Sequence, residues 1–242
     1  MLRAWRFLAT PFLALCLAAP AAAAPYRPDI ALFDGTNGMA YPADYSLNLS
    51  AGGTIEFYVA PKWTTAPAYD PVILSNAGEK GASYMVVLLR DRDGIGIRAG
   101  DQTALAPFDF TDGKLHHVAL ICYADKTTVL VDGVVVAQPA IAFADLPSSG
   151  FFIGSADGDT APMVGAIGGV RIWNIPVSPD DLRTYAMQDL VDDQGAAHPD
   201  IQSLVGISQF QTRSFALLSP EPLVAADDGA AAVEPLPQEV SQ

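Results

Sequence analysis

The chain has 242 residues, half of them apolar, with 13 basic and 27 acidic side chains and a net charge of −14 at neutral pH. It is long enough to bury a full hydrophobic core in one large β-domain or in two small domains. The excess of acidic groups excludes nucleic acids and anionic membrane surfaces as partners, because both repel negatively charged protein.

Residues 1–23 have the order of a secretory signal peptide, with a short basic start, an apolar run over residues 7–19 and an alanine-rich end. The apolar run is too short to span a bilayer, which disfavours an uncleaved anchor, and Leu15 is too bulky for lipoprotein cleavage before Cys16. Cleavage after Ala23 would leave 219 residues (242 − 23) with 11 basic and 27 acidic groups, a net charge of −16. We therefore predict a secreted or periplasmic protein without a membrane span.

From residue 24 to about residue 173 the chain consists of short runs of β-forming residues separated by glycine, aspartate, asparagine and proline. Ten such runs without an intervening helical pattern predict an antiparallel sandwich or barrel. Asp132-Gly133 stands between two apolar runs, which is the strongest short signal of a hairpin. The predicted strands are 30–33, 54–60, 72–75, 84–90, 95–98, 115–123, 127–131, 134–137, 151–154 and 166–173.

One helix is predicted, over residues 179–190, where it closes a domain of residues 24–195. Ser178 is a typical N-cap residue, Pro179 suits the first helical position, and two aspartates follow in the first turn. In the extension 196–218, residues 201–218 include apolar residues without a clean period, so they form either an extra strand pair or a packed segment. Residues 219–242 are acidic and rich in proline and alanine, and we predict a disordered tail because they have few large apolar groups.

Several stretches in a fixed order resemble laminin-G-like domains of the concanavalin A-like lectin/glucanase family. The resemblance covers about residues 29–190 and implies a jelly-roll sandwich of two antiparallel sheets, with a concave sheet and rim loops that can hold a ligand. Gly168 and Gly169 stand where the family commonly has an acidic pair, and Leu115 stands where it often has tryptophan. The stretches that carry the resemblance are 31–37, 46–49, 53–61, 113–120, 129–133, 165–174 and 178–182.

The family includes glycoside hydrolases, which need two carboxylates about 5–10 Å apart. The predicted domain has only two glutamates, Glu56 and Glu79, on separate elements, and we interpret Glu56 as structural. Paired aspartates at 91 and 93 and at 157 and 159 lie in glycine-containing turns, a setting typical of turn residues. We therefore predict a non-catalytic protein, with a divergent hydrolase as the less favoured alternative.

The histidines and the mature chain's one cysteine give no catalytic pattern. Cys122 lies in an apolar run and is predicted to be a buried structural thiol. His116 and His117 should point to opposite faces of one strand, one ring buried and the other exposed, so they cannot ligate one ion together.

No cofactor is predicted, and calcium is not favoured. Calcium prefers several loop oxygens from aspartate, asparagine and backbone carbonyls. Asp34 with Asn37, and Asp157 with Asp159, offer such oxygens, but aspartate next to glycine is also the common composition of a turn. The glycines at 168 and 169 weigh against a metal as well.

The candidate ligand contacts lie on predicted rim loops: Trp63, Tyr69, Asp70, Asp157 and Asp159. Sugar recognition needs an exposed aromatic ring flanked by polar groups. Trp63 either forms such a platform or caps the edge of the sandwich. The favoured function is therefore an exported binding module of carbohydrate-binding or adhesion type, with a glycan or cell-surface protein as partner. The alternative is a protein-interaction or structural envelope module that acts through residues 196–242.

Overall fold

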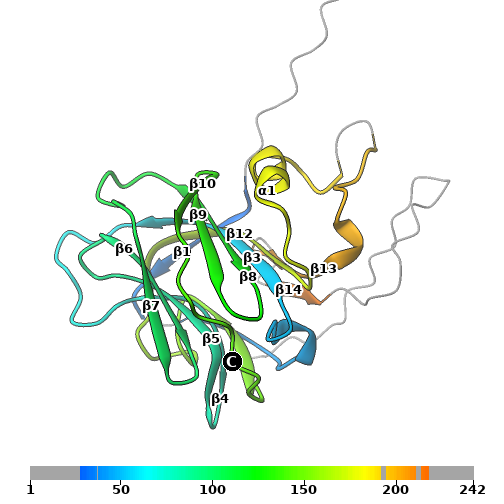
Figure 1. Ribbon diagram of the computed structural model, residues 1–242. Helices are drawn as coiled ribbons and strands as arrows, with labels where there is room; N and C mark the ends of the chain where they lie inside the picture. The colour runs from blue at the N-terminus through cyan, green and yellow to red at the C-terminus, as the bar shows by residue number, and fades with distance from the viewer. Residues whose placement is uncertain (1–27, 37, 192–194, 211–213, 218–242) are drawn as a thin grey trace, which may run out of the picture.

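The computed structural model describes residues 28–36, 38–191, 195–210 and 214–217, which form two antiparallel sheets packed face to face (Figure 1). In sheet A the strand order is β10-β9-β8-β3-β12-β13-β14, and β1 pairs with the first half of β12. The strands of sheet A are β1 (Ile30–Asp34), β3 (Gly53–Pro61), β8 (His116–Cys122), β9 (Thr127–Val131), β10 (Val134–Ala137), β12 (Val164–Trp173), β13 (Leu204–Gln209) and β14 (Ser214–Leu217).

Sheet B has the order β2-β11-β4-β5-β6-β7. Its consecutive strands β4 to β7 form a meander, while β11 returns from later in the chain to lie between β2 and β4. This long return is typical of a jelly roll. The strands of sheet B are β2 (Met39–Tyr41), β4 (Val72–Gly78), β5 (Gly81–Leu88), β6 (Gly94–Ala99), β7 (Gln102–Pro107) and β11 (Gly150–Ile153).

The main core lies between the sheets, and β3 shows how the sequence builds it. Ile55, Phe57 and Val59 alternate along the strand, are fully buried and belong to the inter-sheet core. Cys122 packs in the same core, so the prediction of a buried thiol is confirmed, and burial raises its pKa well above the usual range. The alternate residue Glu56 belongs to the opposite face of the strand.

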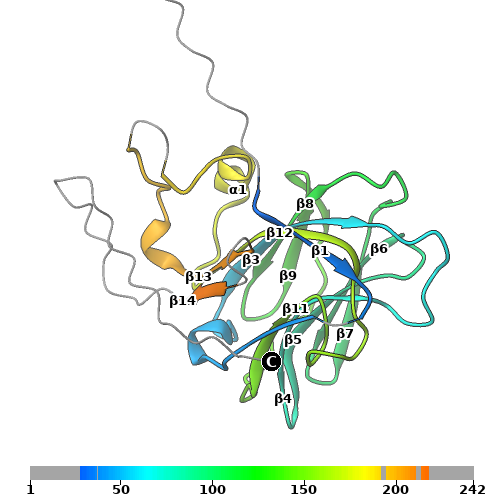
Figure 2. The same cartoon turned by 180° about the vertical axis from the view of Figure 1, so that it is seen from behind.

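That opposite face of sheet A is covered by α1 (Pro179–Tyr185) and the chain after it, as Figures 1 and 2 show on the side of β13. A smaller apolar cluster forms there, in which Leu182 of the helix packs with Ile121 and Trp173. The helix begins as predicted, because the Ser178 hydroxyl accepts a hydrogen bond from the backbone N–H of Asp181 at 3.1 Å. It ends earlier than predicted, at Tyr185.

All ten predicted strands are present, but β2 and β7 were missed. Both lie at the edges of sheet B, and β7 reads Gln-Thr-Ala-Leu-Ala-Pro, a composition that favours no strand by itself. Its strand structure comes from pairing with β6 after a turn at Gly100, whose φ of +55° suits glycine. Of the two predicted forms for residues 201–218, the structure has the strand pair, β13 and β14.

Two predictions concern residues outside the described ranges: the signal peptide at 1–23 and the disordered tail at 219–242. Among the residues that are described, no helix combines the length and the apolar character that crossing a membrane would require.

Candidate functional site

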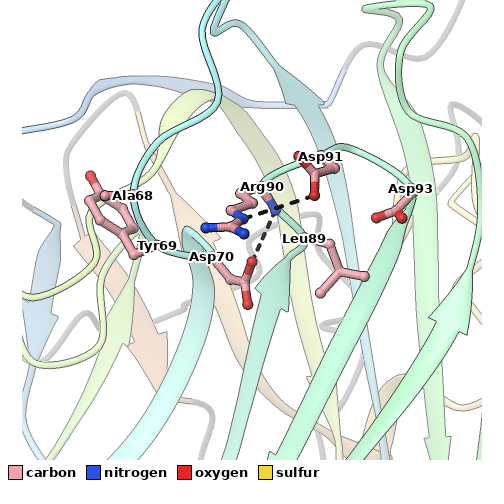
Figure 3. A pocket seen from close by; sticks show the side chains of 7 residues that line it. All are labelled: Ala68, Tyr69, Asp70, Leu89, Arg90, Asp91 and Asp93. Atoms are coloured by element: carbon pink, nitrogen blue, oxygen red, sulfur yellow. Dashed lines mark hydrogen bonds and ion pairs between the residues drawn. The ribbon is translucent and has the colours of Figure 1, made fainter.

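Two loops at one end of sheet B border an open surface hollow of about 340 Å³ (Figure 3). One loop joins β3 to β4 and the other joins β5 to β6. Tyr69 and Asp70, both predicted as ligand contacts, lie in the first loop and line the hollow. The full lining is Ala68, Tyr69, Asp70, Leu89, Arg90, Asp91 and Asp93.

The carboxylate of Asp70 ties the two loops together. Its Oδ1 accepts a hydrogen bond from the backbone N–H of Arg90 at 3.1 Å, and its Oδ2 lies 3.8 Å from Nη2 of Arg98 on β6. The β5–β6 loop is also closed by a turn in which the backbone N–H of Arg92 donates to the carbonyl of Leu89 at 2.8 Å. The backbone around the hollow is therefore held from both sides.

Trp63 lies in the core rather than on the rim. Its side chain is buried, and its indole N–H donates to the backbone carbonyl of Arg90 at 2.9 Å. Of the two interpretations drawn from the sequence, a stacking platform is therefore wrong for Trp63, because the indole needs the apolar space between the sheets and finds its acceptor there. The ring instead supports the β5–β6 loop at the hollow.

Tyr69 is the aromatic residue at the hollow. It is 36% exposed, and its hydroxyl donates to the carbonyl of Pro162 at 3.2 Å, which fixes the ring at the rim. In Figure 3, Tyr69 and Asp93 lie on opposite sides of the view with the guanidinium of Arg90 between them. The Arg90 side chain is 53% exposed, and its Nε is 3.9 Å from Oδ2 of Asp91.

Asp157 and Asp159 do not line this hollow. They lie in the loop between β11 and β12, where Asp157 binds its own loop: Oδ1 accepts the backbone N–H of Thr160 at 2.8 Å, and Oδ2 accepts the Thr160 hydroxyl at 2.8 Å. These hydrogen bonds hold the pKa of Asp157 below its usual value. The turn interpretation describes Asp157 well, because both carboxylate oxygens already have donors.

The other predicted calcium position is similar. Oδ1 of Asp34 accepts the backbone N–H and the hydroxyl of Thr36 at 3.0 and 2.6 Å, while Asn37 lies outside the described residues. At the position of the family's acidic pair, Gly169 has φ of +53° in a register shift of β12, and an added Cβ would lie 3.1 Å from Tyr58. The backbone conformation and the close approach of Tyr58 favour glycine there.

Sequence reasoning missed the hollow's main cation, Arg90, and it considered Asp91 and Asp93 as a catalytic pair but assigned them to a turn rather than to a ligand site. A usable signal was present, because residues 90–93 read Arg-Asp-Arg-Asp between two strongly apolar strands. Such a charged run in a short connection predicts an exposed polar loop. No sequence pattern indicated that this charged loop lies beside the loop that contains Tyr69.

A second group of charged side chains lies on the covered face of sheet A. The carboxylate of Glu56 accepts from Nε2 of His117 and from the indole N–H of Trp173, each at 3.0 Å. Arg171 lies 3.6 Å from Glu56 Oε1 and donates to the carbonyl of Gln188 at 2.8 Å. Burial alone would raise the pKa of Glu56, but the hydrogen bond from His117 and the charge of Arg171 outweigh it and lower the pKa.

His116 makes a separate cluster at the end of the sandwich. Nδ1 is 2.7 Å from Oδ2 of Asp132, Nε2 is 3.0 Å from Oδ1 of Asp112, and the ring packs edge-on against Phe108. The prediction that one histidine ring is buried and the other exposed is wrong, because both His116 and His117 are buried. The carboxylates of Asp112 and Asp132 and the ring of Phe108 enclose the ring of His116.

The chain belongs to the concanavalin A-like lectin/glucanase superfamily, described by the laminin G family model that matches residues 33–183. The resemblance drawn from the sequence and the jelly-roll sandwich are thereby confirmed. Among curated proteins, none matches the chain at a significant level.

Several solved structures share the fold at low sequence identity. A candidate carbohydrate-binding protein from Bacteroides ovatus has a TM-score of 0.54 and 17% identity; the match covers 76% of this chain and 52% of that one, so this chain spans about half of its length. Domain 4 of an extracellular GH43 arabinanase from Geobacillus stearothermophilus, solved with arabinotriose, has a TM-score of 0.52 and 14% identity, covering 67% and 81%. The CBM40 module of a Ruminococcus gnavus sialidase has a TM-score of 0.50 and 16% identity, covering 66% and 98%.

Proposed function

We propose that this protein is a non-catalytic carbohydrate-binding module and that it binds glycans through the hollow at Tyr69. The observation that carries the proposal is the placement of a partly exposed aromatic ring beside charged hydrogen-bonding side chains in an open hollow. The names of the similar structures, two of which are modules of glycan-acting enzymes, support the same class of ligand.

The chemistry of the hollow suits a sugar. The face of a pyranose or furanose ring presents C–H groups that pack on an aromatic ring, while its hydroxyls both donate and accept hydrogen bonds. Tyr69 supplies the ring, Asp91 and Asp93 supply acceptors, and Arg90 supplies donors. Because Asp70 and Trp63 hold the backbone of Arg90 from two sides, the backbone of the loop needs little ordering when a ligand binds.

A catalytic role is less well supported by the carboxylates of the described residues. Glu56 is buried, and both of its oxygens have donors, so it has no access to a substrate. A glycosidase general acid needs apolar surroundings that keep its proton. The Asp91 side chain is instead 68% exposed and faces the guanidinium of Arg90.

We also propose that the protein acts outside the cytoplasm and binds its ligand without calcium. The export proposal rests on the sequence of residues 1–23. The calcium proposal rests on Asp34 and Asp157, whose carboxylates are already engaged by hydrogen bonds within their own turns.

The alternative of a protein-interaction module is weakened because Leu204, Val205 and Phe210 of the extension are buried in sheet A or against it.

The test is a glycan array probed with the full chain and with Tyr69→Ala, in buffer with calcium and again with chelator. We expect binding to a subset of glycans under both conditions, with the signal of the strongest of them reduced in Tyr69→Ala. Incubation of each bound glycan with the protein, followed by mass analysis, checks for cleavage. A blank array would contradict glycan binding, and released fragments would contradict the non-catalytic assignment.

A further inference from the structure

A second hollow, of about 180 Å³, lies beside the 3₁₀ turn η1 (Tyr45–Leu47) that precedes β3. It shares no lining residue with the hollow at Tyr69, and every side chain that lines it is uncharged, in a chain whose net charge is −14. The lining is Tyr45, Ser46, Asn48, Leu49, Ser50, Ala51, Gly52 and Asn174.

Tyr45 presents its ring almost entirely to solvent. It is 79% exposed, more than any other large apolar or aromatic side chain among the described residues. The backbone that carries the ring is fixed, because Asp44 caps the turn and accepts the backbone N–H and the hydroxyl of Ser46 at 2.8 and 2.6 Å. An aromatic side chain exposed on a fixed turn gains nothing for the core, and it is suited to stacking on a ligand.

The backbone beside Tyr45 is rigid. Asn48 donates from Nδ2 to the carbonyl of Leu146 at 3.0 Å and accepts the backbone N–H of Ser50 at 3.1 Å. Leu49 has φ of +54°, a left-handed conformation that is unfavourable for leucine and persists only where the surroundings fix it. The backbone N–H of Gly52 closes the turn on the carbonyl of Leu49 at 3.0 Å.

Hydrogen-bonding groups flank the ring on the open side. Asn174 is exposed, and its backbone N–H is already bound to the carbonyl of Ser203 at 2.9 Å, so its side-chain amide is the group left to face a ligand. The Ser50 hydroxyl is part of the same lining. A neutral amide and a hydroxyl both donate and accept, which matches sugar hydroxyls and offers no charge to a carboxylate or ammonium group.

We propose that the Tyr45 hollow is a second saccharide-binding site, selective for neutral sugar units. The inference extends the proposed function, but it rests on a different aromatic residue and can fail independently. Figures 1 and 2 place the η1 turn and the loop before β4 on opposite sides of the molecule, so a short oligosaccharide cannot reach both hollows. A long glycan chain or two neighbouring chains can, and two linked contacts raise the apparent affinity.

The experiment uses the full chain and three variants, Tyr45→Ala, Tyr69→Ala and the double variant, with Tyr45→Phe as the matched control that keeps the ring. The probes are neutral hexasaccharides of glucose, mannose, xylose and arabinose, the matching polysaccharides, and hexagalacturonate as an anionic probe. Binding is measured by titration calorimetry for hexasaccharides and by affinity electrophoresis for polysaccharides. Melting temperatures of all variants confirm that each is folded.

We expect Tyr69→Ala to retain binding to at least one neutral hexasaccharide and the double variant to lose that binding. Tyr69→Ala should not bind hexagalacturonate. Tyr45→Ala should weaken retention by the polysaccharide about tenfold, while Tyr45→Phe behaves like the wild type. If Tyr69→Ala alone abolishes all binding, the second site is overturned and the proposed function stands. If Tyr45→Ala alone abolishes all binding, the Tyr45 site stands and the assignment of the Tyr69 hollow fails. Wild-type protein that binds none of the neutral probes overturns the Tyr45 site.

Discussion

The hollow at Tyr69 and the cluster around Glu56 contain the same kinds of groups in opposite settings. Each has carboxylate, arginine and aromatic side chains, but Glu56 is 3% exposed whereas the Asp91 side chain is 68% exposed. In the buried cluster both oxygens of Glu56 already have protein donors, so the cluster holds α1 and the following chain against sheet A. In the hollow the charged groups face water. A binding site therefore differs from a structural cluster in its free hydrogen-bonding capacity more than in its residue types.

The largest change in stability is expected when the buried carboxylate of Glu56 is removed. Glu56→Ala would remove the negative charge beside the buried guanidinium of Arg171 and leave the indole N–H of Trp173 without an acceptor, so we expect a loss of about 3–5 kcal/mol in the free energy of unfolding. Chemical denaturation measures it. Glu79→Ala, at an exposed position in the β4–β5 turn, is the control and should change stability by less than about 0.5 kcal/mol. Equal effects of the two variants would contradict the structural role of Glu56.

A smaller effect is expected where the core supports the hollow. Trp63→Phe keeps most of the buried apolar volume but leaves the carbonyl of Arg90 without its indole donor, so stability should fall by about 1–3 kcal/mol. Amide hydrogen exchange should become faster at Arg90 and its neighbours in the loop and stay unchanged in β8. Unchanged exchange in the loop would show that the indole hydrogen bond does not hold the hollow.

A still smaller effect is expected at His116, which lies outside both regions and should make the stability of the protein depend on pH. Although burial lowers the pKa of His116, its hydrogen bonds to Asp112 and Asp132 outweigh burial and raise it. The folded pKa therefore lies above the unfolded value near 6.5, so the stabilisation is complete below about pH 6.5 and is lost as pH rises through the folded pKa. Because Asp132 is half exposed, we expect less than about 1 kcal/mol. Denaturation at pH 5.5 and 8.5 should show a larger loss at high pH in the wild type than in His116→Gln; identical pH dependence would contradict it.

The smallest expected effect is that of calcium. Because the carboxylate of Asp157 is engaged by Thr160 at both oxygens, chelation should change the glycan dissociation constant by less than about twofold. The comparison is between dialysed protein in chelator and the same protein with calcium restored, with magnesium as the control cation. A loss of binding that calcium alone restores would contradict the proposal.

Most of the fold was predictable because strands of a sandwich carry their own signals. Apolar runs between turn residues indicated ten strands, and Ser178 indicated the start of α1. The edge strand β7 was not predictable from its composition, since its structure depends on pairing with β6. The site was predictable only in part. Tyr69 and Asp70 were found, but whether Trp63 is buried and which loop lies beside Tyr69 depend on contacts between distant segments.

Tyr45, the most exposed aromatic residue among those that the structure describes, shows the same limit. In the sequence it stands between Asp44 and Ser46, a polar setting that indicates a turn, but no pattern indicates that the ring stays in solvent. Its exposure follows from Leu47, two residues later, which is fully buried and anchors the turn. Predicting the second hollow therefore required the packing of η1.

Glycan binding at the Tyr69 hollow can be tested directly by one titration. The dissociation constant of the strongest array glycan is measured for the wild type, Tyr69→Ala and Tyr69→Phe, with melting temperatures to confirm folding. We predict that Tyr69→Ala weakens binding about tenfold, or ~1.4 kcal/mol, and that Tyr69→Phe, which keeps the ring and loses only the hydroxyl bond to Pro162, stays within about threefold of the wild type. Wild-type affinity in Tyr69→Ala would contradict the claim.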